Sequence, residues 1–296
     1  MSGPPQVLDR VSPRLQTNWD ARAAANFICG GAGGGLMLAT ALAATLGDKD
    51  LRPLVVIALT LVGAGLTAVW FEIGRPWRAF NVFRHASTSW MARESLIAPV
   101  LFACGGAAIL LERPAAFVAA GLIGVAYVYA QGRMLQANKG IPAFRQMSCV
   151  HMIVVTGLTE GAGLMAVASA HWPSLLAFAY LLAALLVLRY LAWRSYVANL
   201  RSVGAPTGAL DAFRAIETGF VWAGHAAPAV MALAAGVGDI PLLAALAGAL
   251  AAAAGAWFKY TLVCRASFTQ GFALTRLPTR GGGKPGAGVK PGWTQT

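Results

Sequence analysis

The segment AAANFICGGAGGGLMLATALAATLG (residues 23–47) runs without a single charged side chain. An α-helix rises about 1.5 Å per residue, so about 20 apolar residues cross the ~30 Å hydrocarbon core of a bilayer. The segment therefore predicts a membrane-spanning helix. The whole chain has the same character, because 57% of its 296 residues are hydrophobic, only 11% are charged, and the mean hydropathy is +0.62. Soluble domains carry about 25% charged residues, so this composition indicates a polytopic membrane protein.

Eight apolar blocks of this kind follow one another along the chain. The predicted spans are residues 23–47, 53–71, 95–111, 114–132, 146–169, 172–188, 218–238 and 240–258. They predict an all-α integral membrane protein with eight transmembrane helices and both termini on the same side. A polar segment (1–22) precedes the membrane domain (23–270), and the Gly- and Pro-rich tail (271–296) is expected to be disordered.

The first span contains the glycine-rich stretch GGAGGG (residues 30–35). No predicted strand precedes it, and its register does not fit the GxGxxG loop of nucleotide-binding proteins. Gly30 and Gly34, like Gly31 and Gly35, have instead the GxxxG spacing that lets two membrane helices approach closely. The stretch predicts tight helix packing rather than a ligand site.

Lysine and arginine are enriched in the cytoplasmic loops of membrane proteins. Of the 23 in this chain, the loops on one face carry only Lys49, Arg52 and Arg113. The other face carries the rest, and Arg189 and Lys259 are counted there as loop residues. This bias predicts cytoplasmic termini in the inner membrane of a bacterium. The net charge of +12 then reflects topology and does not indicate nucleic-acid binding.

The four cysteines, Cys29, Cys104, Cys149 and Cys264, lie far apart in the sequence. They do not form the short-spaced motifs that hold zinc or an iron–sulfur cluster. We interpret them as small hydrophobic side chains within the spans. Any electron transfer by this chain is expected to use a non-covalent cofactor or a partner protein.

The loop after the second predicted span, FEIGRPWRAFNVFRHASTSWMARE (residues 71–94), gathers charge in an otherwise apolar chain. Interfacial tryptophans and cytoplasmic arginines explain part of this composition. Glu72 is less easily explained, because it follows an uncharged span at a helix C-terminus, where the helix dipole disfavours an anion. We expect an arginine partner to compensate it. Glu94 ends the loop and is expected at the membrane surface, in or beside the first turn of the third span.

Two pieces of this loop, EIGRPWRAFN (72–81) and SWMARE (89–94), resemble the signature loop of the membrane-anchor subunits of dimethyl sulfoxide reductase and its relatives (DmsC type, similar to the polysulfide reductase anchor). The residues that match at the family's spacing are Gly74, Pro76, Arg78, Ala79, Asn81 and Glu94. The segment RMLQANKGIPAF (133–144) resembles the family's loop after its fourth span. One position differs, because Glu72 stands where the dimethyl sulfoxide reductase anchor has a histidine.

The resemblance implies a function for the chain. Such anchors bind a quinone, here ubiquinone or menaquinone, and hold an iron–sulfur subunit that connects to a molybdopterin catalytic subunit. Iron–sulfur clusters and molybdopterin are then expected only in the partner subunits, and no haem is expected. Glu72, Arg78 and Glu94 are the expected quinone-binding and proton-transfer residues, because a carboxylic acid beside an arginine can relay protons. The chain alone is expected to catalyse nothing.

Other residues leave alternatives open. Glu160 lies near the middle of the fifth span, where a charge costs several kcal/mol unless it is paired or protonated. It is either a hydrogen-bonded structural residue or a proton relay, and it is also the expected midplane site if the chain is a secondary transporter. His151 and His225 lie near the cytoplasmic ends of two spans and are the candidate ligands if the chain is a haem b cytochrome. Pro228 is expected to release the carbonyl of Gly224 and kink the seventh span.

Overall fold

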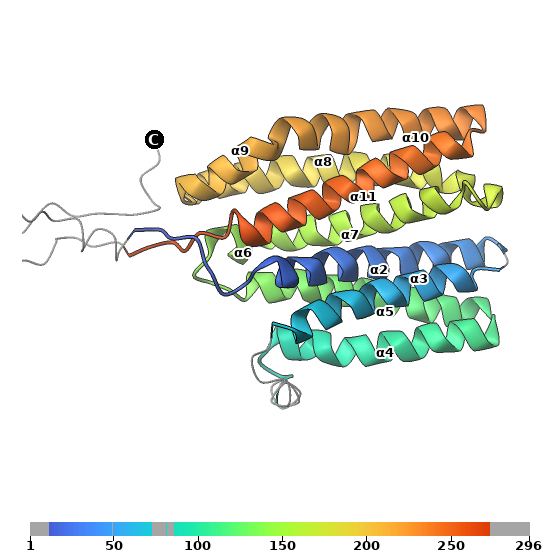
Figure 1. The fold of residues 1–296 in the computed structure, drawn as a ribbon, viewed down its shortest axis with the longest axis horizontal. Helices are drawn as coiled ribbons and strands as arrows, with labels where there is room; N and C mark the ends of the chain where they lie inside the picture. The colour runs from blue at the N-terminus through green and yellow to red at the C-terminus, as the bar shows by residue number, and fades with distance from the viewer. Residues whose placement is uncertain (1–11, 49, 73–80, 82–85, 273–296) are drawn as a thin grey trace, which may run out of the picture.

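The computed structural model describes residues 12–48, 50–72, 81 and 86–272, and it forms an elongated bundle of nearly parallel helices (Figure 1). Eight helical segments in this part of the chain are long and apolar enough to cross a membrane. The predicted all-α, eight-span fold is therefore confirmed. The elements are α2 (Ala21–Thr45), α3 (Arg52–Trp70), α4 (Trp90–Leu111), α5 (Pro114–Gln136), α6 (Pro142–Arg145), α7 (Met147–Ala168), η2 (Pro173–Ala177), α8 (Phe178–Ser202), α9 (Thr207–Val221), η3 (Trp222–Ala226), α10 (Ala227–Gly238) and α11 (Pro241–Cys264).

Two helices extend well beyond the apolar blocks that predicted them. The sixth span continues to Ser202, and the seventh helical segment begins at Thr207 instead of residue 218. The predicted loop 189–217 is therefore wrong in its length. Hydropathy predicts which residues lie in the bilayer core, but it does not predict where a hydrogen-bonded helix ends. Polar and charged residues therefore continue both helices beyond the membrane core.

The first span, α2, lies at the centre of the bundle and packs against α3, α5, α7 and α11 (Figure 1). A Cβ atom on Gly35 would stand 2.8 Å from the carbonyl carbon of Gly157 and closer still to its oxygen. A Cβ atom on Gly34 would stand 2.8 Å from the carbonyl oxygen of Gly124. The GxxxG spacing thus places α2 against the backbones of α7 and α5, as predicted.

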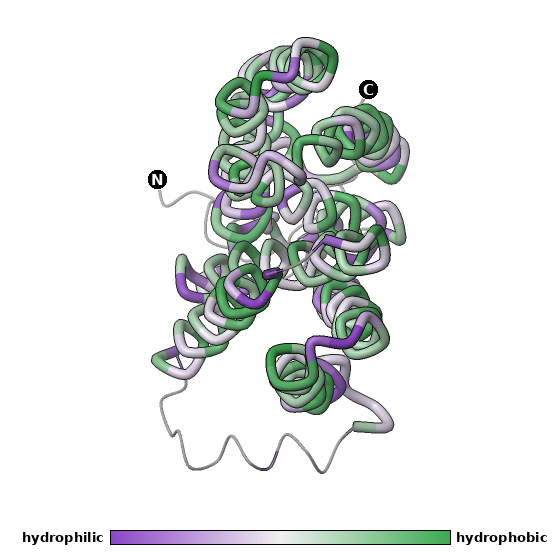
Figure 2. The backbone as a smooth tube through the Cα atoms, turned by 90° about the vertical axis from the view of Figure 1, so that its right-hand side faces the viewer, coloured by the Kyte–Doolittle hydropathy of each residue, from purple (hydrophilic) through white to green (hydrophobic). Residues whose placement is uncertain are grey.

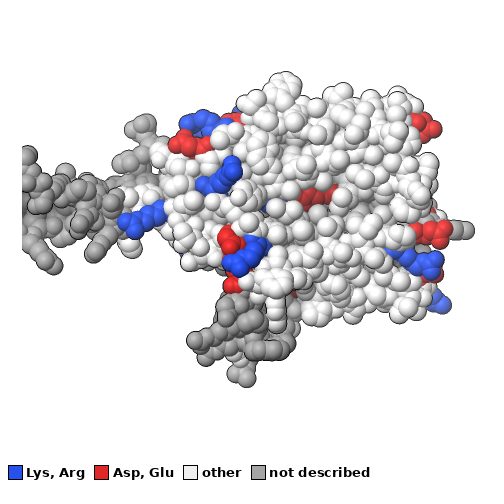
Figure 3. Space-filling model, viewed as in Figure 1, with Lys and Arg blue, Asp and Glu red and all other residues white. Residues whose placement is uncertain are grey.

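The two ends of the described chain meet at one end of the bundle. Gln16 donates its backbone N–H to the carbonyl of Ser267 at 3.1 Å, and Thr269 donates to the carbonyl of Arg14 at 2.7 Å. Figure 3 shows most charged side chains near the two ends of the bundle and a broad, mostly uncharged band between them that contains one acidic patch. The end-on view in Figure 2 shows largely hydrophobic helices. Both features are typical of a protein that spans a bilayer.

The seventh span contains a π-helical turn, η3, followed by Pro228 in the first turn of α10. Proline has no backbone N–H and therefore leaves the carbonyl of Gly224 without its helical donor. Arg189 on α8 supplies a replacement, since its Nη2 donates to that carbonyl at 2.6 Å. The interruption expected at Pro228 is therefore present, and it is capped by a side chain from a neighbouring helix.

Candidate functional site

A buried polar cluster lies between α2, α4 and α5, near the end of the bundle where α2 begins. We call Asn26, Glu94, Tyr127 and Gln131 the Glu94 cluster. Glu94 is 4% exposed, and its Oε1 accepts from Asn26 Nδ2 at 3.1 Å and from Gln131 Nε2 at 3.3 Å. Tyr127 Oη donates to Asn26 Oδ1 at 3.5 Å. Buried polar groups are costly unless they are hydrogen-bonded, so the cluster holds Glu94 in one position.

Local sequence features position this cluster. Ser89 caps α4 by accepting from the N–H of Ala92, which fixes where the helix begins and sets Glu94 one turn inside it. Gln131 Nε2 also donates to the carbonyl of Asn26 at 2.9 Å. A Cβ atom on Gly30 would stand 2.9 Å from the Tyr127 ring and 3.2 Å from the Gln131 amide carbon. Glycine at this position leaves room for both side chains against α2.

The carboxylate of Glu94 has neutral partners. Within the described residues, none of the ion pairs includes it. The neighbouring Arg93 points outward, donating to the carbonyls of Ala86 at 2.9 Å and Ser87 at 2.8 Å. Glu94 therefore lies deeper than the surface position expected from the sequence, held by amides instead of arginines.

Cations lie nearby around an aromatic ring. The guanidinium carbons of Arg93 and Arg133 lie 4.4 Å and 4.5 Å from the centroid of the Trp90 ring. Arg133 also donates to Tyr129 Oη at 2.6 Å. Cation–π contacts of this kind hold arginine side chains at a defined depth. They place positive charge at the first turn of α4, one turn from Glu94.

One atom of the cluster lacks a partner. Gln131 Oε1 is buried and accepts no hydrogen bond from any described residue. A buried acceptor left unpaired costs roughly 1–3 kcal/mol. This oxygen can therefore accept a hydrogen bond from a hydroxyl group of a ligand that contacts the cluster.

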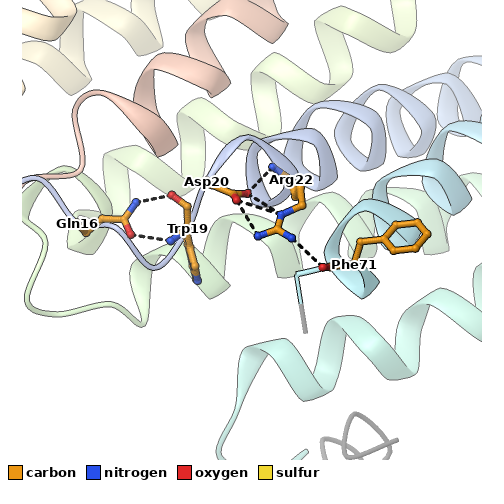
Figure 4. A network of polar contacts seen from close by, with 5 residues as sticks. All are labelled: Gln16, Trp19, Asp20, Arg22 and Phe71. Atoms are coloured by element: carbon orange, nitrogen blue, oxygen red, sulfur yellow. Dashed lines mark hydrogen bonds and ion pairs between the residues drawn. The ribbon is translucent and has the colours of Figure 1, made fainter. Parts of the chain in front are cut away.

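Glu72 follows α3 and lies half-buried beside the start of α2. Burial, and then the charge of Asp20, raise the pKa of Glu72, while the charge of Arg22 opposes this shift. Arg22 forms its ion pair with Asp20 at 2.8 Å and donates to the carbonyl of Phe71 at 2.8 Å (Figure 4). The hydrogen bonds from Arg22 hold the pKa of Asp20 below its usual value. Among the described residues, Arg22 on α2 is therefore the cation whose charge lowers the pKa of Glu72. Arg78, the third residue expected at the site, lies outside the described residues.

A family model described as the DMSO reductase anchor subunit (DmsC) matches residues 27–204, more than half of the chain. The chain belongs to the DMSO reductase anchor subunit family. This anchor family forms the membrane subunit of a molybdoenzyme complex. The matched range contains Glu72, Glu94, Gln131 and Glu160 and ends before α9. A search of curated proteins found no match.

The anchor subunit also has a second buried polar cluster, between α7, α8, η3 and α11. We call Glu160, Arg189, His225 and Lys259 the Glu160 cluster. Lys259 Nζ lies 2.6 Å from Glu160 Oε2, with exposed fractions of 0% and 1%, and donates to the carbonyl of Phe27 at 2.8 Å. Arg189 and Lys259 were expected in cytoplasmic loops, and this expectation is wrong. Both side chains are buried, because α8 and α11 continue past the apolar blocks and carry them among neighbouring helices.

Arg189 is held by acceptors instead of a carboxylate. Besides the carbonyl of Gly224, it donates to the carbonyl of Ala251 at 2.9 Å and to His225 Nε2 at 3.1 Å. His225 Nδ1 lies 2.6 Å from the carbonyl of Phe220 and is therefore the donor of that ring. Both ring nitrogens of His225 are engaged, so a haem could bind there only by breaking one of these hydrogen bonds.

The other candidate haem ligand, His151, lies in a different environment. It is exposed on α7 and lines a groove of about 480 Å³ with Tyr129, Ser148 and apolar residues of α7 and α8. No group of three His, Cys, Asp or Glu side chains that can hold a metal ion is found among the described residues.

Proposed function

We propose that the anchor subunit binds a membrane quinone, ubiquinone or menaquinone, against the Glu94 cluster and passes electrons between the quinone pool and an iron–sulfur subunit. The observation that carries this proposal is the hydrogen bonding of the cluster, in which some polar groups have partners and one acceptor has none among the described residues. A buried carboxylate is held by two amides, and Gln131 Oε1 is a free acceptor beside it. A headgroup hydroxyl can donate to Gln131 Oε1, and protonated Glu94 can donate to a headgroup carbonyl oxygen.

The interconversion of quinone and quinol exchanges two electrons and two protons. Glu94 can hold one proton on its carboxylate, because Asn26 and Gln131 fix the orientation of Oε1 through neutral N–H groups. Tyr127 orients Asn26 in turn. A carboxylic acid with these partners changes its protonation without breaking an ion pair, which suits a proton donor and acceptor.

Glu72 is proposed to exchange protons with the aqueous phase. It lies outside the spans, and its raised pKa makes it a better proton carrier near neutral pH than an ordinary glutamate. Arg78, which lies outside the described residues, is proposed to orient a carboxylate or a headgroup oxygen of the quinone.

The electron-transfer partner is proposed to dock at the end of the bundle where the chain's described ends meet. This end carries the starts of α2 and α4 and most of the lysines and arginines among the described residues, and the enrichment of these residues in cytoplasmic loops predicts that the end is cytoplasmic. A cytoplasm-facing iron–sulfur subunit would connect to a molybdopterin subunit that acts on cytoplasmic substrates. Phenylacetyl-CoA or sulfite oxidation are the reactions we propose for such a complex.

The proposal is tested with Glu94→Gln in the assembled complex. Loss of a positioned acid–base group lowers turnover by about 10²–10⁴-fold, so quinone-linked turnover should fall at least about 100-fold while the subunits still co-purify. Glu112→Gln is the matched control, because Glu112 forms a half-exposed ion pair with Arg52 at the other end of the bundle. Wild-type turnover in Glu94→Gln would remove Glu94 from the site.

The two alternatives have separate tests. A secondary transporter predicts substrate uptake by liposomes that contain this chain alone, whereas an anchor subunit predicts none. A haem b cytochrome predicts a Soret band and a sharp alpha band on reduction of the purified chain.

A further inference from the structure

The Glu160 cluster holds an excess of positive charge. Lys259 and Arg189 each contribute +1 and Glu160 contributes −1 when all three are ionised, which leaves +1. The guanidinium of Arg189 is always charged. His225 stays neutral, because its Nε2 accepts from Arg189 and cannot carry a second proton there. Excess charge in a membrane interior is costly, so the cluster gains by losing one proton or by facing a negative charge.

The Glu94 cluster has the complementary imbalance. Ionised Glu94 contributes −1, and its hydrogen-bond partners, Asn26 and Gln131, are neutral. Among the described residues, Tyr127 is the other titratable group in contact with it, and Arg93 and Arg133 lie about one turn away, at the Trp90 ring. An ionised Glu94 would therefore be stabilised by a positive charge on a neighbouring face of the bundle.

Helix α2 joins the two clusters. Gln131 of the Glu94 cluster donates to the carbonyl of Asn26, and Lys259 of the Glu160 cluster donates to the carbonyl of Phe27, the next residue. Each cluster also lies over a glycine one turn later. A Cβ atom on Gly30 would meet the Gln131 side chain, and one on Gly31 would meet Lys259 Nζ. Positions i and i+4 share a helix face, so the clusters lie on two adjacent faces of α2.

We propose that the Glu160–Lys259 pair is a second proton-exchange site, coupled across α2 to Glu94 so that a proton on one site disfavours a proton on the other. When Glu94 takes up a proton, the negative charge that compensates the Glu160 cluster disappears. The cluster then releases its excess proton more readily. The existence of this second site does not depend on quinone; only the event that loads Glu94 rests on the proposed function.

The atoms of the pair give the proton a route. The proton on Lys259 Nζ passes along the 2.6 Å hydrogen bond to Glu160 Oε2, leaving a neutral amine and a neutral acid. After the neutral carboxyl group rotates, the protonated oxygen occupies the position of Oε1, which has no hydrogen-bond partner among the described residues, and releases the proton there. Thr156, one turn earlier on α7, carries another buried hydroxyl without a partner in the same set. The carboxylate that remains pairs again with the next proton that Lys259 binds.

All titratable groups that face the pair are part of this charge balance. Arg189 faces Glu160 from α8, and Cys29 faces the pair from α2. Neither replaces Lys259 as the proton donor, because Arg189 does not deprotonate and Cys29 is a thiol without a hydrogen bond to Glu160 in the described set.

The test is a pH titration of the full-length chain in lipid nanodiscs, without quinone, followed by the infrared bands of carboxylic acid, carboxylate and lysine amine groups. Glu160→Gln should remove one titrating component and Glu94→Gln another, whereas Glu112→Gln leaves both. Two unit charges on the order of 10 Å apart, one helix diameter, interact at an effective dielectric constant of ~20 by about one pH unit. Glu94→Gln removes the negative charge of Glu94, so the midpoint of the Glu160 component should fall by about this amount.

Two further variants protect the test against misfolding. The double variant Glu160→Gln/Lys259→Met keeps the cluster's net charge of +1 through Arg189. In this variant the Glu94 component should titrate as a single, uncoupled step. Gly31→Ala keeps every charge but displaces Lys259 Nζ, and it should shift the Glu160 component, whereas Gly106→Ala, whose Cβ atom would meet nothing within 4 Å, should not.

Two results overturn the proposal. An unchanged spectrum in Glu160→Gln would make the pair a static structural contact, and a Glu160 component whose midpoint does not move in Glu94→Gln would exclude the coupling. If the components couple but Glu94→Gln leaves quinone-linked turnover intact, the second site stands and the proposed quinone site fails.

Discussion

Gly35→Ala tests the packing that positions both clusters, since it adds one methyl group where α2 touches α7. The new Cβ atom would stand 2.8 Å from the carbonyl carbon of Gly157, and the nearest atoms all belong to backbone. Carbon atoms pack at about 3.5–4.0 Å, so the two helices must separate by roughly 1 Å. Overpacking costs about 1–3 kcal/mol, and the better helix propensity of alanine returns up to about 1 kcal/mol. Because backbone cannot rotate away, we expect a net loss of roughly 2 kcal/mol.

The measurement is the free energy of unfolding in mixed micelles, followed by tryptophan fluorescence as a denaturing detergent is added. Gly106→Ala is the matched control, because its Cβ atom would meet nothing within 4 Å. The control should be neutral or more stable by up to about 1 kcal/mol, the difference in helix propensity. The reasoning is refuted if Gly35→Ala is as stable as the control, since α2 and α7 would then not pack backbone against backbone.

Three further predictions follow from the same contacts. Lys259→Met leaves Glu160 buried without its cation and should lower the free energy of unfolding by about 3–5 kcal/mol, whereas Lys259→Met/Glu160→Gln recovers most of this loss; equal stability of both variants in micelle unfolding would exclude the ion pair. The folded-state pKa of Glu72 is raised above its ordinary value of 4.5, so its contribution to stability is complete below that pH and is lost as pH rises through the folded pKa. Glu72→Gln should therefore be as stable as wild type at acid pH and more stable than wild type at neutral pH. The opposite order in a pH series of unfolding midpoints would contradict this. Asp20→Ala removes the side-chain acceptor at the start of α2 and should cost about 1 kcal/mol in the same assay, with no change expected for Asp48→Ala.

The sequence predicted the number of spans because hydropathy measures directly whether a segment suits the bilayer core. It also predicted the close packing of α2, since the glycines themselves permit the approach. It misplaced Arg189 and Lys259, because a charge near the end of an apolar block is expected in a loop. Only the tertiary structure shows that α8 and α11 continue and carry both side chains to buried partners.

The two buried clusters show what sequence reasoning could supply. Glu94 was named as a site residue through the family resemblance and Glu160 as an acid deep in a span, but the partners of neither were predicted. Asn26 and Gln131 were missed because each is a neutral residue within an apolar span, and nothing in the local pattern distinguishes a buried amide from a solvated one. Their polarity inside predicted spans was the available signal, since a buried amide needs a partner.

The central claim is that quinone contacts the Glu94 cluster. Its most direct test is photolabelling of the membrane-bound complex with an azido-quinone, followed by identification of the labelled peptides by mass spectrometry. Our account predicts labelling of the segments of α2, α4 and α5 around Asn26, Glu94 and Gln131, suppressed by excess unlabelled quinone and reduced in Glu94→Gln. Specific labelling confined to the groove at His151, with these three segments unlabelled, would contradict it.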